Sequence, residues 1–513
     1  MAGDVSLLAT LWPGPQVLAQ AAILVPLAGA LVAFVLTVRL AVVVTVPLGL
    51  AVALGLAVSV AQEGPVRVAL GGWTAPLGIG LRADGPAAVF LAMTAVVMAG
   101  VALFVDRDRA LGDLTHENGR RRAGLFWTLT FLLWAGLAAA FLTHDLFNMY
   151  VALELTSLSG IALVAFAGGA APLVAQMRYL FQATFGSLLF LMGVALVYGQ
   201  AGVLDMALAG QSLGPSVTAG AAALLVTLGL MMKSAIWPLH AWLPPAHASA
   251  PAPVSAMLSA LVVKASLYLL IRLWADTFSG LATPSLLGVI GVFGAGAILW
   301  GSLMALVQQR LKLMIAYSTL AQLGYALLAL PLAGMAGLGA GLAWSAALLH
   351  LVSHGLAKAA LFLAAGALAG ALGSDDRAAL AGAGRRCPVP VFVLGLAGLS
   401  IMALPPSGGF LAKWLLLGAA IEQGRWLIVA VLVSGGLLAA GYLARFVLPV
   451  FAPMTDDAPL PVDARAGRKD LAALVLALVS LALGLAAAPV FDLLAVTASG
   501  TLAPLAPQGS AAP

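Results

Sequence analysis

Four lysines of the chain lie inside long apolar stretches, where an ionised side chain is costly. They are Lys233, Lys264, Lys358 and Lys413. A cation at the centre of a bilayer costs about 2.5–3.5 kcal/mol, so each of these positions needs a reason. A lysine can release its proton, whereas an arginine in a protein effectively cannot. The row of buried lysines is therefore typical of a proton path; the alternative is that each ammonium snorkels or forms a structural pair.

One glutamate, Glu154, also lies within an apolar stretch. A lone carboxylate in lipid would be neutral or paired, and Lys233 is the partner we expect because other buried bases are few. An ion pair between two helices could release a proton when the carboxylate moves away. The alternative is a static salt bridge that fixes helix packing.

His350, His354 and Lys358 follow one another at a spacing of four residues. This spacing places them on one face of a helix, about 6 Å apart along its axis, so they could relay protons over about 12 Å. Two histidines at this spacing could instead bind a metal, although Leu351 stands where zinc proteases have glutamate. Hydrogen bonding between helices is a further alternative.

Two proline-rich segments lie next to buried lysines. Trp237-Pro238 follows Lys233 closely, and His240 and His247 flank the further prolines there. The segment 405–409, Pro-Pro-Ser-Gly-Gly, precedes Lys413 in the same way. Because neither segment can continue a helix, we expect two interrupted helices, and the similar placement of the lysines hints at an internal repeat.

The composition of the chain indicates the kind of protein in which these residues lie. Of 513 residues 63% are hydrophobic and 8% charged, with a mean hydropathy of +1.09. Such a chain cannot cover a water-exposed surface, so we predict a multi-pass membrane protein. The one cysteine, Cys387, excludes internal disulfides and cysteine-held iron–sulfur or zinc centres. We expect no cofactor and no bound metal. We also expect no nucleic acid partner, because the sequence has no run of basic residues interleaved with aromatic ones.

Apolar runs predict an all-α bundle of about fourteen transmembrane helices. We place these helices near residues 16–37, 40–61, 85–105, 123–143, 146–168, 176–199, 219–239, 252–273, 284–307, 313–332, 337–371, 389–422, 426–450 and 470–495.

Basic residues of the expected loops set the orientation. Loops after odd-numbered helices hold fifteen, among them Arg178 and Lys312. Loops after even-numbered helices hold four: Arg67, Arg82, Arg272 and Arg425. The positive-inside rule then places both termini on the outer, periplasmic face of a bacterial inner membrane.

The chain resembles the proton-conducting, antiporter-like subunits shared by respiratory complex I, membrane-bound hydrogenases and Mrp-type cation/proton antiporters. The resemblance covers nearly the whole sequence. Its matching segments are Asp145-Leu146-Phe147-Asn148 with Glu154, Lys233 to His240 and on to Pro253, Lys264, Lys312 with Ala316-Tyr317-Ser318 and Gln322-Leu323-Gly324-Tyr325, His350 with His354 and Lys358, and Lys413.

This resemblance implies inverted five-helix repeats over helices 4–8 and 9–13, with helices 7 and 12 broken. The implied parts are residues 1–122, 123–273, 284–450 and 451–513. It also implies a proton path through Glu154, Lys233, Lys264, the His350–His354–Lys358 stripe and Lys413, supported by Asp145, His240, His247 and Tyr317.

Within the family, residues 71–79, Asp84 and the lysine at 413 are similar to the D subunit of Mrp antiporters. The stretch after Asn148 departs from it, reading Met-Tyr-Val-Ala-Leu where D subunits tend to be rich in phenylalanine. The resemblance implies a subunit of an Mrp-type Na⁺/proton antiporter that works with other hydrophobic subunits in the lipid bilayer. Alternatives are a pumping subunit of a complex I-like oxidoreductase or hydrogenase, with no redox chemistry in this chain itself, and a stand-alone solute carrier.

Overall fold

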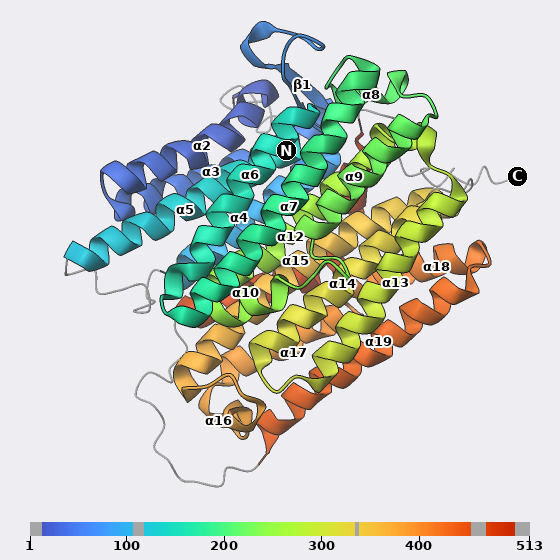
Figure 1. The fold of residues 1–513 in the computed structure, drawn as a ribbon. Coiled ribbons are helices and arrows are strands. Elements are labelled where there is room, and N and C mark those ends of the chain that lie inside the picture. The colour runs from blue at the N-terminus through green and yellow to red at the C-terminus, as the bar shows by residue number, and fades with distance from the viewer. Residues whose placement is uncertain (1–12, 106–116, 334–337, 453–467, 498–513) are drawn as a thin grey trace, which may run out of the picture.

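The computed structural model describes residues 13–105, 117–333, 338–452 and 468–497. Within these ranges the chain is a bundle of long helices that run roughly side by side, with one small β-hairpin at an end of the bundle (Figure 1). Eleven helices of the described ranges are long and apolar enough to cross a membrane, and a bent pair near the C-terminus would make a twelfth. The chain is therefore a multi-pass membrane protein, as its composition predicts.

The eleven long helices include one span built from three consecutive segments. They are α2 (Pro15–Val35), α3 (Val38–Glu63), α4 (Gly85–Val105), α5 (Glu117–Leu142), α6 (Leu146–Val164), α7 (Ala170–Ala201), α11 (Ala252–Met257) with the π-helical turn η4 (Leu258–Val262) and α12 (Val263–Asp276), α13 (Pro284–Val307), α14 (Leu311–Ala333), α15 (Leu338–Leu372) and α19 (Trp426–Val447).

Shorter helices and single turns complete the described part. The α-helices are α8 (Met206–Ser212), α9 (Val217–Lys233), α10 (Leu243–Ser249), α16 (Ala383–Arg386), α17 (Pro388–Met402), α18 (Gly408–Glu422), α20 (Arg468–Leu485) and α21 (Ala488–Ala495). The 3₁₀ turns are η1 (Leu70–Gly72), η3 (Ala165–Ala167), η5 (Ser279–Leu281), η6 (Arg377–Leu380) and η7 (Leu448–Phe451).

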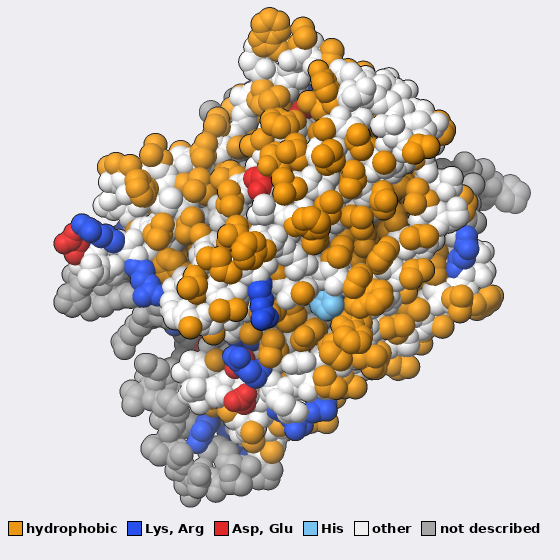
Figure 2. All heavy atoms as spheres, viewed as in Figure 1, with side chains coloured by type: hydrophobic (Ala, Val, Ile, Leu, Met, Phe, Trp, Pro, Cys, Tyr) orange, Lys and Arg blue, Asp and Glu red, His pale blue; other side chains and the backbone are white. Residues whose placement is uncertain are grey.

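Burial separates the central helices from those at the periphery. The apolar window of the span Ala252–Asp276 is wholly buried, and that of α14 is 89% buried. The corresponding window of α19 is only 28% buried. Hydrophobic side chains cover most of the face in Figure 2, and the charged ones gather mainly toward the end that holds α16. A surface of this kind suits lipid, so the buried polar groups stand out as the exceptions.

Both predicted helix interruptions are present. Helix α9 ends at Lys233 and α10 begins at Leu243, while α17 ends at Met402 and α18 begins at Gly408. Each interruption contains an alanine in the left-handed region, Ala235 at φ 53° and Ala403 at φ 62°. Non-glycine residues pay for this conformation, so the surrounding packing must hold both breaks in place.

The sequence missed the hairpin and the bend of the last helix. Strands β1 (Val66–Ala69) and β2 (Gly80–Ala83) pair antiparallel, so the all-α expectation needs this small addition. The predicted helix 470–495 is two helices, α20 and α21, bent by 78°. Pro489 lies in the first turn of α21 and removes a backbone donor, which explains why α20 does not continue.

Many of the basic residues assigned to loops by the sequence lie in regular structure instead, among them the following four. Arg178 lies in α7, within the helix predicted at 176–199, and Lys312 lies in the first turn of α14. Arg272 is buried in α12 and Arg82 is buried in β2. The sequence placed both of these arginines in loops, but they lie in the interior, and their carboxylate partners explain how they are tolerated there.

We expect Gly324→Val to destabilise the folded chain, because a β-carbon at this position of α14 would lie 2.4 Å from the backbone oxygen of Gly294 in α13. Overpacking of this kind costs about 1–3 kcal/mol. The matched control is Gly288→Val in α13, where a β-carbon meets nothing within 4 Å. Heat-induced loss of monodisperse protein in detergent is the measurement, and equal midpoints for the two variants would contradict the prediction.

Candidate functional site

Glu154 and Lys233 form an ion pair between α6 and α9. The ammonium nitrogen of Lys233 lies 2.9 Å from Oε1 of Glu154, and the lysine side chain is only 3% exposed. Lys233 also donates to the hydroxyl of Ser157 at 2.9 Å, and Ser187 of α7 donates to the same oxygen of Glu154. The pairing is the one expected from the sequence, whereas the two serines were not foreseen. Ser157 follows Glu154 by three residues, a spacing that puts both on one face of α6 and could have identified it.

The C-terminal end of helix α9 determines the position of Lys233. It is the last residue of α9, directly before the break. A cation in the last turn is favoured by the carbonyl end of the helix dipole, which partly offsets its burial. Ser216 caps the other end of α9 by accepting from the Ala219 amide, so both ends of this short helix are satisfied.

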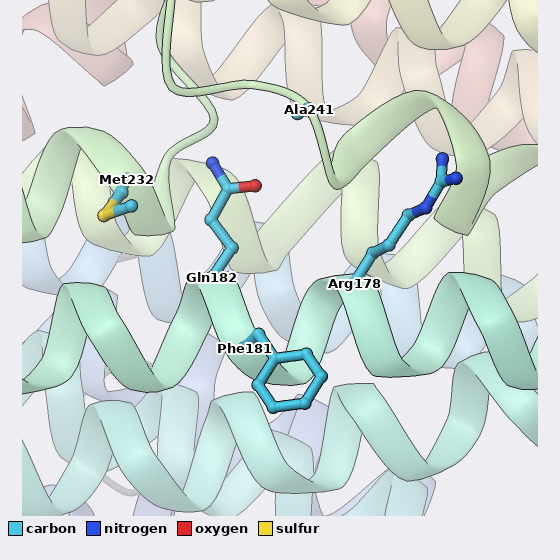
Figure 3. A pocket seen from close by; sticks show the side chains of 5 residues that line it. All are labelled: Arg178, Phe181, Gln182, Met232 and Ala241. Atoms are coloured by element: carbon cyan, nitrogen blue, oxygen red, sulfur yellow. The ribbon is translucent and has the colours of Figure 1, made fainter.

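A surface hollow of about 480 Å³ lies beside this break. Arg178 and Gln182 project from α7 toward the loop that carries Ala241, with Met232 at the end of α9 (Figure 3). Gln182 donates to the carbonyl of Leu239 and so ties α7 to the loop. The hollow reaches to within one residue of Lys233 along the chain.

Lys264 lies at the centre of the bundle and is fully buried. Its ammonium donates to the backbone carbonyl of Ser259 in the π-helical turn η4. In the described part of the chain, no carboxylate forms a salt bridge with Lys264. A neutral carbonyl solvates the ammonium but leaves its charge uncompensated.

The stripe on α15 is assembled as the spacing predicts. The rings of His350 and His354 stack with centroids 5.6 Å apart, and Nε2 of His350 lies 3.0 Å from the carbonyl of Gln322. Neither ring nitrogen of His354 has a hydrogen-bond partner among the described residues. Lys358 donates to the carbonyl of Ile315 at 2.8 Å and to a hydroxyl of the same helix, α14.

Lys413 closes the row from the second interrupted helix. Its ammonium donates to the carbonyl of Ile401 at 2.9 Å, at the end of α17 where the break frees backbone carbonyls. It also lies 4.1 Å from the ring centroid of Tyr325, and this ring lies 5.5 Å from that of His350. Tyr325 therefore connects Lys413 to the α15 stripe through a cation–π contact.

The supporting residues take different places. Asp145 caps α6 by accepting from the Asn148 amide at 2.7 Å, about 13 Å along the helix from Glu154. Burial raises the pKa of this carboxyl. His240 lies half-buried in the first break, and His247 stacks on Phe362 with ring centroids 4.7 Å apart. Tyr317 is only partly buried, and the hydroxyl that receives Lys358 belongs to the next residue, Ser318.

A second buried charge cluster was not foreseen. Asp84 accepts from Arg272 at 2.7 Å and forms an ion pair with Nε of Arg82 at 3.0 Å, while Arg82 donates to Asp276 at 2.7 Å. Tyr268 accepts from Arg272. Lys264, Tyr268, Arg272 and Asp276 follow one another at spacings of four, a polar stripe on α12 that the sequence could have revealed.

The cluster lies beneath the hairpin, next to His144. This histidine is buried, and the backbone amide of His144 donates to the carbonyl of Gly80 in β2. Burial and the nearby guanidinium groups of Arg82 and Arg272 lower the pKa of His144 to about 3. The imidazole is therefore neutral at physiological pH, and the cluster balances two arginines with two aspartates.

Residues of the types that bind metals do not gather in threes in the described ranges. No group of three or more histidine, cysteine, aspartate or glutamate residues in those ranges could hold an ion. The arrangement instead offers a series of exchangeable protons on one glutamate, four lysines and two histidines. These residues are Glu154, Lys233, Lys264, His350, His354, Lys358 and Lys413.

Comparison with known proteins finds relatives among subunits of NADH-quinone oxidoreductases and Na⁺/H⁺ antiporters. A family model described as "NADH:quinone oxidoreductase/Mrp antiporter, TM" matches residues 143–439. The chain is 36% identical over 423 residues to the N subunit of the NADH-quinone oxidoreductase of Desulforudis audaxviator, covering 80% of this chain and 82% of that protein. It is 29% identical over 435 residues to the D subunit of the Na⁺/H⁺ antiporter of Alkalihalophilus pseudofirmus, covering 84% and 85%.

The fold agrees with this relationship. A chain of the membrane-bound sulfane sulfur reductase, an archaeal respiratory membrane complex, superposes with a TM-score of 0.85 at 29% identity. The superposition covers 95% of this chain and 98% of the other. The likeness therefore extends well beyond the residues of the site.

Removal of the Asp84 carboxylate should destabilise the chain strongly. Asp84→Ala removes the carboxylate that forms ion pairs with both Arg82 and Arg272, and breaking a buried ion pair costs about 3–5 kcal/mol. Glu117→Ala is the control, because its pair with Arg121 is exposed and such pairs contribute little. Thermal unfolding in detergent compares the two variants, and a stable Asp84→Ala protein would show that the cluster is not a structural clamp.

Proposed function

Because the chain belongs to the NADH:quinone oxidoreductase/Mrp antiporter family, we propose that it is the proton-translocating, antiporter-like subunit of a multisubunit membrane complex. The observation that carries this proposal is the buried Glu154–Lys233 ion pair at a helix break, 2.9 Å between its charged atoms. Both partners can exchange protons, and no guanidinium group fixes the charge of the carboxylate at this pair within the described ranges. The pair is thus suited to moving a proton rather than only holding helices together.

The mechanism follows from electrostatics in a medium of low dielectric constant. While the carboxylate of Glu154 stays near, its charge stabilises the ammonium of Lys233. Withdrawing the carboxylate leaves the ammonium with the neutral hydroxyl of Ser157, which favours proton release. The proton then moves along Lys264, the α15 stripe and Lys413, and uptake and release alternate between the two faces.

We extend the proposal to the architecture. Helices α9 and α10 form the broken helix 7, and α17 and α18 form the broken helix 12, which gives fourteen membrane helices when α20 and α21 count as one. The inverted repeats are residues 123–273 and 284–450, flanked by 1–122 and 451–513. Both termini lie on the outer face of the bacterial inner membrane.

For the complex itself, we propose an Mrp-type antiporter that exchanges protons for a cation such as Na⁺. Support comes from the 29% identity to the D subunit of an Na⁺/H⁺ antiporter over 84% of the chain. A redox-driven complex is the second candidate. The 36% identity to the N subunit of an NADH-quinone oxidoreductase favours it, as does the likeness to a chain of a sulfur-reducing respiratory complex.

Co-purification distinguishes the two. We expect a tagged chain, extracted gently from its native membrane, to bring along the small hydrophobic subunits of a cation/proton antiporter, identified by mass spectrometry. Subunits that carry iron–sulfur clusters, flavin or nickel would replace the antiporter assignment by the redox-driven one. A chain that purifies alone would contradict both and favour a stand-alone carrier.

Lys233→Ala and Glu154→Ala should each lower proton transport by more than about tenfold, because positioned proton-transfer groups contribute at least this much. Acridine-dye quenching in everted membrane vesicles that contain the intact complex is the measurement. Lys469→Ala is the control, since this lysine lies at the start of α20, outside the proposed path. Unchanged transport by an assembled Lys233→Ala complex would rule out the proposed role of the ion pair.

A further inference from the structure

A pair of hydroxyl groups joins the environments of two buried lysines at the middle of the bundle. Lys264 belongs to the span Ala252–Asp276, and Lys358 belongs to α15. The ammonium groups have different partners: Lys264 donates to the carbonyl of Ser259, and Lys358 donates to the carbonyl of Ile315 on α14. A proton that moves along the site must pass between these two places.

Ser259 and Thr319 lie there. Their hydroxyl oxygens are 2.8 Å apart, and both residues are fully buried. The hydroxyl of Thr319 also lies 3.0 Å from the carbonyl of Ile315, the same oxygen that receives Lys358. Lys264 is therefore bonded to the carbonyl of Ser259 itself. Lys358 is bonded to the carbonyl of Ile315, which also lies within hydrogen-bond distance of the Thr319 hydroxyl.

The carbonyl of Ile315 has more donors than it can accept at once. Besides the helical amide of Thr319, it faces the hydroxyl of Ser318 at 2.9 Å, that of Thr319 at 3.0 Å and the ammonium of Lys358 at 2.8 Å. A carbonyl oxygen has two lone pairs, so these donors compete. When Lys358 is charged and holds the carbonyl, the hydroxyl of Thr319 is free to donate to Ser259 instead.

Two arrangements of the same pair follow. With Lys358 neutral, Thr319 donates to the Ile315 carbonyl and accepts from Ser259, while a charged Lys264 holds the Ser259 carbonyl. With Lys358 charged, Thr319 donates to Ser259, and the hydroxyl of Ser259 is free to donate to a neutral Lys264. The competition thus favours a charge on one of the two lysines at a time, which also avoids two buried ammonium groups without carboxylate partners.

Resting on the function proposed above, we propose that Ser259 and Thr319 are relay residues that pass one proton between Lys264 and Lys358. Lys264 turns from the carbonyl to the hydroxyl of Ser259 and gives it a proton. Ser259 passes its own proton to Thr319. The hydroxyl of Thr319 turns from the Ile315 carbonyl toward the amine of Lys358, which binds the same carbonyl oxygen, and passes its own proton to that amine. The number of protons is conserved, and the hydroxyl orientations left behind are those of the second arrangement.

Thr319→Val is the decisive variant, because valine keeps the shape of threonine and removes the hydroxyl. We expect proton transport in everted vesicles to fall by more than about tenfold while the complex still assembles. Thr319→Ser keeps the hydroxyl and loses a methyl group, and we expect it to retain most of the transport. If Thr319 served only in packing, Thr319→Val would retain more transport than Thr319→Ser, because valine keeps the shape and serine does not.

Thr94→Val is the matched control. Thr94 is also fully buried in a central helix, and its hydroxyl donates to the carbonyl four residues earlier, that of Phe90, at 2.8 Å. Its transport should equal that of the unmodified complex. Should Thr319→Val fail to assemble, Ser259→Ala takes its place with the same expected loss.

The outcomes separate the relay from the function on which it rests. Normal transport by an assembled Thr319→Val complex, with transport abolished in Lys358→Ala, would overturn the relay and leave the proposed function standing. Normal transport in Lys358→Ala would overturn the proposed function itself. Loss in Thr319→Val with recovery in Thr319→Ser and no change in Thr94→Val would support the relay.

Discussion

An ion removed from water must recover its lost solvation from the protein, and this cost organises the interior of the bundle. Each buried cation of the site is met by oxygen atoms: a carboxylate for Lys233, backbone carbonyls for Lys264, Lys358 and Lys413. Backbone carbonyls inside a helix normally accept hydrogen bonds from the amides of the same helix. The lysines therefore bond either to a carbonyl that accepts a second hydrogen bond or to one that a helix end leaves without an amide partner. For Lys264 and Lys413 these carbonyls lie at irregular features of the fold, the π-helical turn η4 and the end of α17.

The helix breaks supply part of this solvation. The end of α17 exposes the carbonyl that Lys413 uses, and the end of α9 presents Lys233 to the carboxylate of a neighbouring helix. Irregular backbone at membrane depth is tolerated only where its own polar groups are satisfied. At the second break Lys413 serves both partners, since its ammonium gains an acceptor and the interrupted helix gains a donor.

The buried arginines and the buried lysine Lys264 have different kinds of partner. Arg82 and Arg272 are locked by Asp84 and Asp276 beneath the hairpin, with charges that balance and that arginine cannot give up. Lys264 is held by a neutral carbonyl, which stabilises the charged form without fixing it. The first arrangement suits a rigid end of the bundle, and the second suits groups that change their protonation state.

The sequence alone determined the membrane character of the chain, its two helix breaks and the identity of the Glu154–Lys233 pair. These features depend on composition, on proline and on the cost of burying a charge, all of which can be judged residue by residue. Only the tertiary structure decided which oxygens receive Lys264, Lys358 and Lys413, that Arg272 is buried, and that Ser259 meets Thr319. The contacts of Lys358, Arg272 and the Ser259–Thr319 pair join helices far apart in the chain, whereas Lys264 and Lys413 reach carbonyls that only the π-helical turn and the helix break place within range. A serine or threonine in an apolar helix satisfies itself locally unless packing brings it a partner.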